Sequence, residues 1–162
     1  MRGMVVWFSG LPMAGKSSLA RAACARLAPR AILLDEDELH DAIAHAPATD
    51  EPAFAATTAG VAALLARQGF IVLVAASARR RSEREHARAL APRFLEVHVA
   101  TPLGGGAGRE GHGVFFESAA AAGPEIERGY EPSVAPDLIA RGGRDQLALD
   151  RLVERLESGD RA

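Results

Sequence analysis

The sequence predicts an α/β fold in which helices cover both faces of a parallel β-sheet. Two observations carry this prediction: strand-like and helix-like segments alternate along the 162 residues, and the strand-like segments are apolar at consecutive positions. A strand that is apolar at every position is buried on both faces, as in parallel sheets covered by helices. Ligands of such folds lie at the carboxyl ends of the strands. The length predicts a single domain, 1–162.

The first half of the chain contains two predicted strands and two predicted helices. In chain order these elements cover residues 4–9, 17–28, 31–34 and about 53–68, with a polar segment before the last. The first helix has small apolar side chains on one face, while Arg21 and Arg26 face outward. On the second helix, the predicted apolar face consists of Phe54, Thr58, Val61 and Leu65, and Gly69 ends the helix.

The second half continues the alternation and ends in a helix. Predicted strands cover 70–74 and 94–100, a weaker one covers 137–140, and predicted helices cover 82–90 and 144–158. The last helix is amphipathic, because apolar residues recur at i, i+3, i+4 and i+7. These residues are Leu149, Leu152, Val153 and Leu156.

A phosphate-binding motif follows the first strand directly. Its eight residues are Gly10, Leu11, Pro12, Met13, Ala14, Gly15, Lys16 and Ser17, which fit the pattern G-x-x-x-x-G-K-[ST]. Backbone amides of such a loop surround an anion, and the helix that follows directs its positive N-terminal end at the same phosphates. Because the required strand and helix flank the motif, the sequence predicts the P-loop NTPase fold.

This loop predicts that ATP and Mg²⁺ are the cofactors. Lys16 is expected to contact the β- and γ-phosphates, and the hydroxyl group of Ser17 is expected to bind Mg²⁺. The predicted nucleotide-binding stretch extends to Ser18. Met13 stands where many kinase loops of this kind have a third glycine, so a positive φ there would strain the methionine.

An acidic segment, Asp35-Glu36-Asp37-Glu38, follows the second strand. Its apolar run and acidic pair imitate the Walker B motif of motor ATPases, but it comes directly after the phosphate-loop helix. In small-molecule kinases of this fold, an Asp-x-Asp pair at this place lies near Mg²⁺ and the acceptor hydroxyl group, where a carboxylate accepts a proton. Asp35 and Asp37 are therefore candidate catalytic and metal-binding residues. The alternative interpretation is a solvated acidic turn and helix cap.

Composition excludes several functional classes. The chain has 19 basic and 21 acidic residues, so no broad basic surface for nucleic acid is expected. Its apolar runs are too short to span a membrane, and its first strand leaves no room for a signal peptide. The single cysteine, Cys24, is interpreted as a core residue and fits a reducing compartment. A cytoplasmic location is expected, with a small-molecule substrate, and a homodimer is left open.

The segment 103–135 interrupts the alternation of strands and helices. It contains the glycine-rich stretch 104–108 and the alanine-rich stretch 119–123. We interpret this segment as a lid over the active site, with a surface loop as the alternative.

Over nearly its whole length, the chain resembles adenylylsulfate (APS) kinases. The resemblance rests on 5–11 with 14–20, on Leu34-Asp35-Glu36-Asp37-Glu38-Leu39, and on segments around Arg81, Glu96, Thr101, Tyr130 and Pro136. It implies transfer of the γ-phosphoryl group of Mg·ATP to the 3′-hydroxyl group of APS. It also assigns Arg109, at the approach to the lid, as a nucleotide-binding and catalytic cation.

Departures from the family pattern concentrate on the acceptor side. His40 stands where the family has an arginine, and 53–57 replace its Glu-Asn-Ile-Arg-Arg sequence. Residues 76–79 replace its Phe-Ile-Ser-Pro, and 112–117 replace a lysine-rich part of its lid. Arginine is the residue suited to bidentate binding of phosphate and sulfate, and alanine or threonine cannot substitute for it.

Three hypotheses follow from this combination of a retained phosphate loop and an altered acceptor side. The protein is a kinase of a different alcohol, or an APS kinase in which Arg79, Arg80, Arg81 or Arg84 replaces the lost guanidinium groups. As a third hypothesis, it is a non-catalytic nucleotide-binding domain. The first two require Lys16, Ser17, Asp35 and Asp37, all of which are present.

Overall fold

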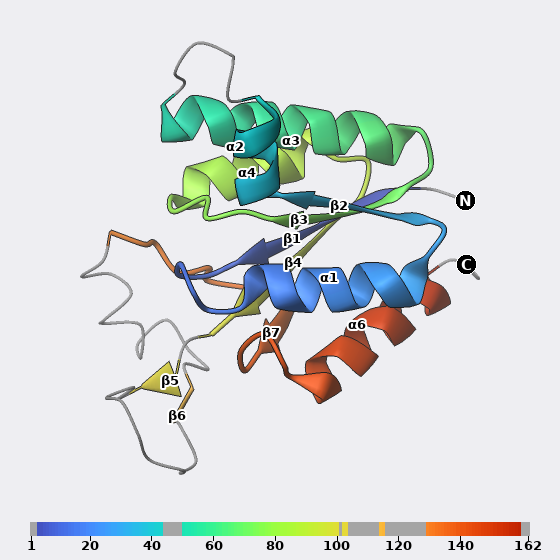
Figure 1. Ribbon diagram of the computed structural model, residues 1–162, viewed down its shortest axis with the longest axis vertical. Coiled ribbons are helices and arrows are strands. Elements are labelled where there is room, and N and C mark those ends of the chain that lie inside the picture. The colour runs from blue at the N-terminus through green and yellow to red at the C-terminus, as the bar shows by residue number, and fades with distance from the viewer. Residues whose placement is uncertain (1–2, 44–49, 101, 104–113, 116–128, 160–162) are drawn as a thin grey trace.

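The computed structural model describes residues 3–43, 50–100, 102–103, 114–115 and 129–159. Five parallel strands form the sheet in the order β2-β3-β1-β4-β7 (Figure 1). The strands are β1 (Met4–Ser9), β2 (Ala31–Asp35), β3 (Ile71–Ala75), β4 (Phe94–Val99) and β7 (Leu138–Ala140). The helices are α1 (Lys16–Leu27), α2 (Glu36–Ala42), α3 (Glu51–Arg67), α4 (Arg81–Leu90) and α6 (Gln146–Ser158). The predicted fold class is confirmed.

Helices cover both faces of this sheet. Helices α1 and α6 lie on one face, and α2, α3 and α4 lie on the other (Figure 1). One hydrophobic core therefore joins α1 and α6 to the sheet, and includes Phe8, Leu19, Leu73 and Leu152. The second core, around Trp7, joins α3 and α4 to the opposite face. Since every residue of β1 and β3 is buried, these are the central strands that their continuous apolar sequences predict.

Two details differ from the sequence expectations. The polar segment after β2 forms a helix, α2, which begins directly at Glu36 because Asp35 caps it. On α3, the buried face consists largely of alanines, which are Ala55, Ala59, Ala62, Ala63 and Ala66, whereas Val61 is 40% exposed. Phe54 and Thr58 of the predicted apolar face are buried and Leu65 is half-buried, as expected. The small alanine side chains allow this helix to approach the sheet and α4 closely.

The predicted lid, 103–135, lies mostly outside the described residues. In its described part, β5 (Pro102–Leu103) and β6 (Val114–Phe115) pair antiparallel, and 129–135 leads back to the sheet. Among the described residues, no helix is long and apolar enough to cross a membrane.

The strand register places the ends of three strands at one edge of the sheet. Asp35 at the end of β2 is aligned with Ala75 of β3, which is aligned with Phe8 of β1. Ser9, the last residue of β1, is aligned with His98 of β4. The phosphate loop therefore begins at the same edge at which Asp35 ends its strand, as expected for ligand sites of parallel sheets.

Candidate active site

The predicted phosphate loop connects β1 to α1, and its two flanking glycines are structurally required. Gly10 has φ +137°, and a Cβ atom there would lie 2.4 Å from the carbonyl oxygen of Val99. Gly15 has φ +100°, and its Cβ would lie 2.5 Å from the backbone of Gly143, in the turn between β7 and α6. Any side chain at either position would therefore displace neighbouring backbone.

Lys16 is the first residue of α1 and is 9% exposed. Its Nζ atom donates hydrogen bonds to the carbonyl oxygens of Gly10, at 3.1 Å, and Leu11, at 2.9 Å. Burial lowers the pKa of Lys16; the carboxylates of Glu36, Asp37 and Asp35 oppose this shift, and Arg79 adds to it. Lys16 therefore lies among the charges that the sequence assigned to the site. It is also the only lysine in the chain.

Met13 occupies the tip of the loop with a left-handed backbone, φ +66°, and a fully exposed side chain. The conditional expectation of strain at this position is confirmed, since the left-handed conformation costs an L-residue roughly 1–2 kcal/mol. We expect Met13→Gly to be more stable than the parent by up to about 1 kcal/mol, because glycine's greater unfolded-state entropy offsets part of the relief.

Urea denaturation checks this prediction. Fluorescence of Trp7, the only tryptophan and fully buried, reports unfolding. Met13→Val is the matched control and is expected to be the least stable of the three proteins, because a β-branched residue tolerates positive φ poorly. If the Met13→Val protein is more stable than the Met13→Gly protein, the assigned backbone conformation is contradicted.

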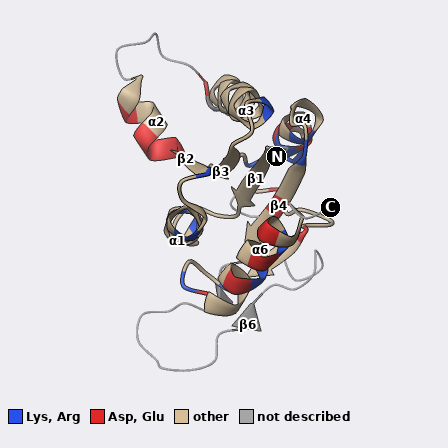
Figure 2. Ribbon diagram, turned by 90° about the vertical axis from the view of Figure 1, so that its right-hand side faces the viewer, with Lys and Arg blue, Asp and Glu red and all other residues tan. Residues whose placement is uncertain are grey.

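The two candidate carboxylates differ in their surroundings. Asp35 is 4% exposed, and one carboxylate oxygen accepts a hydrogen bond from the backbone N–H of Asp37 at 3.1 Å. Its other oxygen is buried without a hydrogen bond and lies 3.8 Å from a guanidinium nitrogen of Arg21. Asp37 is exposed, on the first turn of α2, which carries a row of acidic residues (Figure 2). Asp35 is thus a helix cap, as the alternative interpretation held, and also a buried carboxylate at the site's edge.

Glu36, which the sequence did not single out, connects the two strands beside this edge. Its carboxylate accepts a hydrogen bond of 2.6 Å from the backbone N–H of Ser77, after β3. This bond fixes the start of α2, and therefore Asp37, relative to β3.

The other predicted site residues are placed as follows. Leu11 and Ala14 are buried in the core below the loop, Ser17 is half-buried in the first turn of α1, and Pro12 and Ser18 are exposed. Ser17 is thus the second residue of the helix, directly after Lys16. The predicted cation Arg109 lies outside the described residues.

A buried charged cluster adjoins the site and was not predicted from the sequence. Glu96 of β4 accepts a hydrogen bond from the hydroxyl group of Ser9 at 2.8 Å, and its carboxylate lies 3.0 Å from Nε of Arg84. Glu96 is 5% exposed and Arg84 is 3% exposed. The alternation of side chains along β4 could have indicated this cluster, since Glu96 and His98 share one face of an otherwise apolar strand.

His98 lies beside this cluster, with its Nδ1 atom 3.5 Å from the hydroxyl oxygen of Tyr130. Burial lowers the pKa of His98 to about 4, against the attraction of Glu96 and together with the repulsion of Arg84. The unfolded chain binds a proton below about pH 6.5, and the folded protein does not until about pH 4. The free energy of unfolding therefore falls as the pH falls through this window, by about 3 kcal/mol at pH 4.

Unfolding measured at pH 7 and pH 4 checks this prediction. Relative to the parent, His98→Asn is expected to gain about 3 kcal/mol between pH 7 and pH 4, because it lacks the titrating group. His86→Asn replaces an exposed histidine and is expected to follow the parent. Parallel pH profiles for the parent and His98→Asn would contradict the neutral, buried state of His98.

On the acceptor side, two of the residues that differ from the family pattern contact each other. The rings of His40, on α2, and Phe54, on α3, stack with centroids 3.6 Å apart and planes 8° apart. Phe54 is 4% exposed. The two rings therefore form a contact between the two helices.

Of the four arginines proposed as substitutes, Arg79 is the one whose charge acts on Lys16. Arg84 is engaged by Glu96 and donates a 2.7 Å hydrogen bond to the carbonyl oxygen of Ala78. Arg80 and Arg81 are exposed. Arg79 is half-buried, and its carbonyl oxygen accepts a hydrogen bond from the backbone N–H of Glu131 at 2.8 Å.

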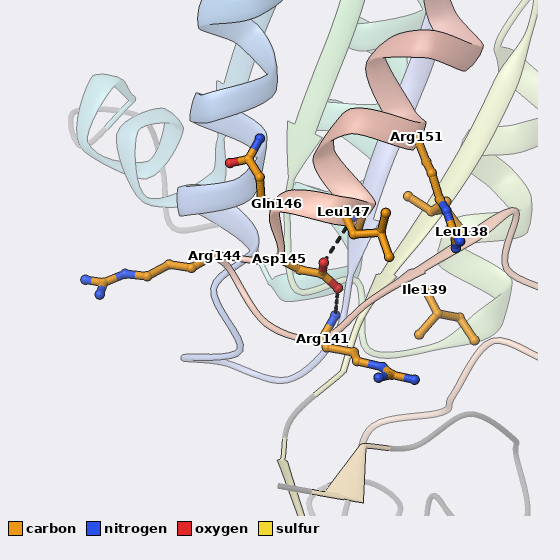
Figure 3. Close-up of a pocket in the computed structure, with 9 residues that line it drawn as sticks. Leu138, Ile139, Arg141, Arg144, Asp145, Gln146, Leu147 and Arg151 are labelled. Atoms are coloured by element: carbon orange, nitrogen blue, oxygen red, sulfur yellow. Dashed lines mark hydrogen bonds between the residues drawn. The ribbon is translucent and has the colours of Figure 1, made fainter. Parts of the chain in front are cut away.

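A surface cavity of about 910 Å³ lies beside the turn between β7 and α6 (Figure 3). Asp145 closes this turn by accepting hydrogen bonds from the backbone N–H groups of Arg141 and Ala148, at 2.7 and 3.0 Å. In Figure 3, the side chain of Arg151 points toward Leu138, and that of Arg144 points away from the other labelled side chains. None of the described site residues lines this cavity, and Gly15 of the site lies against Gly143 of the turn.

Comparisons with known proteins point to one family. The family model described as adenylylsulphate kinase matches residues 2–141. The adenylyl-sulfate kinase of Chloroflexus aurantiacus is 35% identical over 169 residues, covering 98% of this chain and 91% of the relative. That of Shewanella amazonensis is 33% identical, covering 98% and 86%.

Solved structures lead to the same family. The Mycobacterium tuberculosis APS kinase, solved in complex with AMPPNP and APS, superposes with a TM-score of 0.72 at 27% identity, covering 96% of this chain and 98% of that chain. A gluconokinase from Sinorhizobium meliloti, at 20% identity and a TM-score of 0.56, shares the fold. With the family model matching most of its length, the chain belongs to the adenylylsulphate kinase family.

Proposed function

We propose that this protein is an Mg·ATP-dependent phosphotransferase that phosphorylates the hydroxyl group of a small alcohol other than APS. The observation that carries the proposal is the meeting of Lys16 and Asp35 at one edge of the sheet. Lys16 is a buried cation, and Asp35 is a buried carboxylate, one oxygen of which makes no hydrogen bond. Buried charges of both signs at the ends of parallel strands are typical of phosphoryl-transfer sites.

The phosphate loop supports binding of the nucleotide. Lys16 donates to the carbonyl oxygens of Gly10 and Leu11, and phosphate oxygens would take over these hydrogen bonds when a nucleotide binds. The exchange replaces neutral acceptors by charged ones around a buried ammonium group, where charge-assisted hydrogen bonds are strong. The N-terminus of α1 adds its backbone N–H groups to the same anion.

The residues present fit a Mg²⁺ ion. Magnesium is bound in such sites by one or two carboxylates, a hydroxyl group and substrate phosphates, all oxygen ligands. Asp35 offers the oxygen that makes no hydrogen bond, and Ser17 and Asp37 supply the hydroxyl group and the second carboxylate. When bound, the ion neutralises charge that develops on the phosphate oxygens.

Asp37 is the proposed proton acceptor. Its side chain is exposed on the first turn of α2, where an alcohol can reach it, while Glu36 fixes that turn to β3. In the proposed reaction, the alcohol oxygen forms a bond to the γ-phosphorus as the bond to the β–γ bridging oxygen breaks. The hydroxyl proton passes to the carboxylate of Asp37, and ADP leaves.

The acceptor side supports an acceptor other than APS. The positions of a family arginine and asparagine are occupied by His40 and Phe54, whose stacked rings contact each other. Neither ring can supply the bidentate donor that a phosphosulfate group requires. Each lost hydrogen bond to a charged group is worth about 1.5–3 kcal/mol, so the loss of several would weaken APS binding by many decades.

A non-catalytic nucleotide-binding role is the second candidate, and Met13 favours it. Its left-handed backbone strains the loop at a position where a glycine would fit without cost. Such strain weakens nucleotide binding only if the bound loop needs a different conformation, which a direct comparison of Met13→Gly with the parent would reveal.

An ATP-consumption assay with Mg²⁺ tests both candidates. APS and a panel of small alcohols are offered to the parent and to Asp35→Asn, with the Chloroflexus relative as the positive control for APS. We expect turnover with at least one alcohol, lost in Asp35→Asn, and turnover with APS at least about 10³-fold below the control. Turnover with APS equal to the control would overturn the choice of acceptor. Nucleotide binding without any turnover would favour the non-catalytic role, and no binding at all would exclude both.

A further inference from the structure

The buried pair of Glu96 and Arg84 holds three separate segments of the chain at the edge of the candidate site. One oxygen of Glu96 accepts the hydrogen bond of Ser9, and the other accepts a 3.0 Å hydrogen bond from the hydroxyl group of Ser133. Arg84 donates to the carbonyl oxygens of Ala78 and Glu131. Its guanidinium group also lies over the ring of Tyr130, 5.1 Å from the ring centroid.

Each of these segments leads to a different part of the site. Ser9 is fully buried and directly precedes Gly10, the first residue of the phosphate loop. Ala78, with φ +31°, directly precedes Arg79, whose charge acts on Lys16. Residues 130–133 lie at the C-terminal end of the predicted lid, 103–135, and lead the chain back to β7.

From this arrangement we infer that Glu96 is a positioning residue, which couples segment 130–133 to the phosphate loop through Ser9 while Arg84 holds its carboxylate in place. Within the described part of the chain, the hydrogen bonds and ion pairs of the Glu96 side chain are with residues not predicted to bind nucleotide, so its effect on the loop passes through the hydroxyl group of Ser9. A carboxylate in a poorly hydrated site binds its donors strongly, so a change at one oxygen is transmitted to the donor on the other. Segment 130–133, at the C-terminal end of the predicted lid, thus acts on the phosphate loop.

The charges around the pair fit a positioning role. Arg88 lies 3.9 Å from Glu96 and 3.5 Å from Asp137, whose carboxylate accepts a 2.8 Å hydrogen bond from the backbone N–H of Glu96. Arg155 in turn lies 3.3 Å from Asp137. With Arg84 inside and Arg88 at the surface, the two carboxylates are balanced by cations, and Glu96 has fixed partners on both oxygens.

Ser133→Ala tests the coupling with the least disturbance of the core, because Ser133 is only half-buried. Amide hydrogen exchange of 9–17 is measured in the nucleotide-free protein, so the readout does not depend on catalysis. We expect exchange in this stretch to accelerate about 3- to 10-fold, whereas Ser82→Ala, an exposed serine of α4, leaves it unchanged. Ser133→Thr retains the hydroxyl group and is expected to restore protection.

A double-mutant cycle separates positioning from a general loss of stability. If Glu96 joins the two serines, the effects of Ser9→Ala and Ser133→Ala on loop exchange are not additive, and Ser133→Ala has no further effect in Glu96→Gln. Urea midpoints measured beside them show whether global unfolding causes the change. Additive effects, or an unchanged loop in Ser133→Ala, would overturn the inference.

Activity gives a second readout, which rests on the proposed function. Ser133→Ala is expected to raise the KM for ATP about 3- to 10-fold with a smaller change in kcat, since the loop binds phosphate in the ground state as well. If the parent turns over no alcohol, the proposed function fails, while hydrogen exchange still decides the positioning role. If the parent is active but Ser133→Ala does not change the hydrogen exchange of the loop, only the positioning role fails.

Discussion

Lys16→Met is expected to lower phosphoryl transfer by at least about 10²–10³-fold and to weaken ATP binding, because it removes the only cation of the phosphate loop. Methionine keeps the length and apolar stem of the side chain, so the change is confined to the ammonium group. Preorganised charges that face developing negative charge contribute this much in enzyme sites. Calorimetric titration with ATP and the ATP-consumption assay measure the two effects.

The same lysine allows a second measurement on the unmodified protein. Since Lys16 is the only lysine, an amine-specific reagent labels it alone apart from the terminal amino group. Its pKa is lowered by burial, so labelling is expected at a lower pH than for a free lysine, and ATP with Mg²⁺ is expected to protect it. Arg67→Met, which removes an exposed cation at the far end of α3, is the control and should keep both ATP binding and turnover.

Arg84→Met is expected to lower the free energy of unfolding by about 3–5 kcal/mol, which is the largest change in stability that we expect in this chain. The substitution leaves the carboxylate of Glu96 buried without its cation, and an unpaired buried charge costs several kcal/mol. It also leaves the carbonyl oxygens of Ala78 and Glu131 without their donor. Urea denaturation followed by Trp7 fluorescence measures the loss.

Two companion variants identify the cause of that loss. Arg88→Met removes a half-exposed cation 3.9 Å from the same carboxylate, and it is expected to cost less than about 1 kcal/mol. Adding Glu96→Gln to Arg84→Met removes the unpaired charge and should recover a large part of the stability. Equal losses for Arg84→Met and Arg88→Met would mean that burial does not decide the strength of this pair.

The sequence predicted the fold because its signals are local. Continuous apolar runs at β1 and β3, a glycine at each end of the phosphate loop and the periodicity of α6 each follow from neighbouring residues. The retained lysine and the acidic segment after β2 likewise identified the edge at which the candidate site lies. At Met13, the place in the motif where many such loops have a glycine raised the possibility of a positive φ, and the structure has φ +66° there.

Local patterns were enough to predict the strands of the main sheet, the phosphate loop and the acidic segment after β2, because backbone preferences and hydrophobic periodicity act over a few residues. The buried pair of Glu96 and Arg84 between Ser9 and Ser133, and the stacking of His40 on Phe54, emerged from the folded arrangement. Ser9 and Glu96 are 87 positions apart, and the sequence singled out Arg84 only as one of four substitutes for the lost guanidinium groups. Their pairing depends on strand order and on what each helix covers, which no local pattern contains.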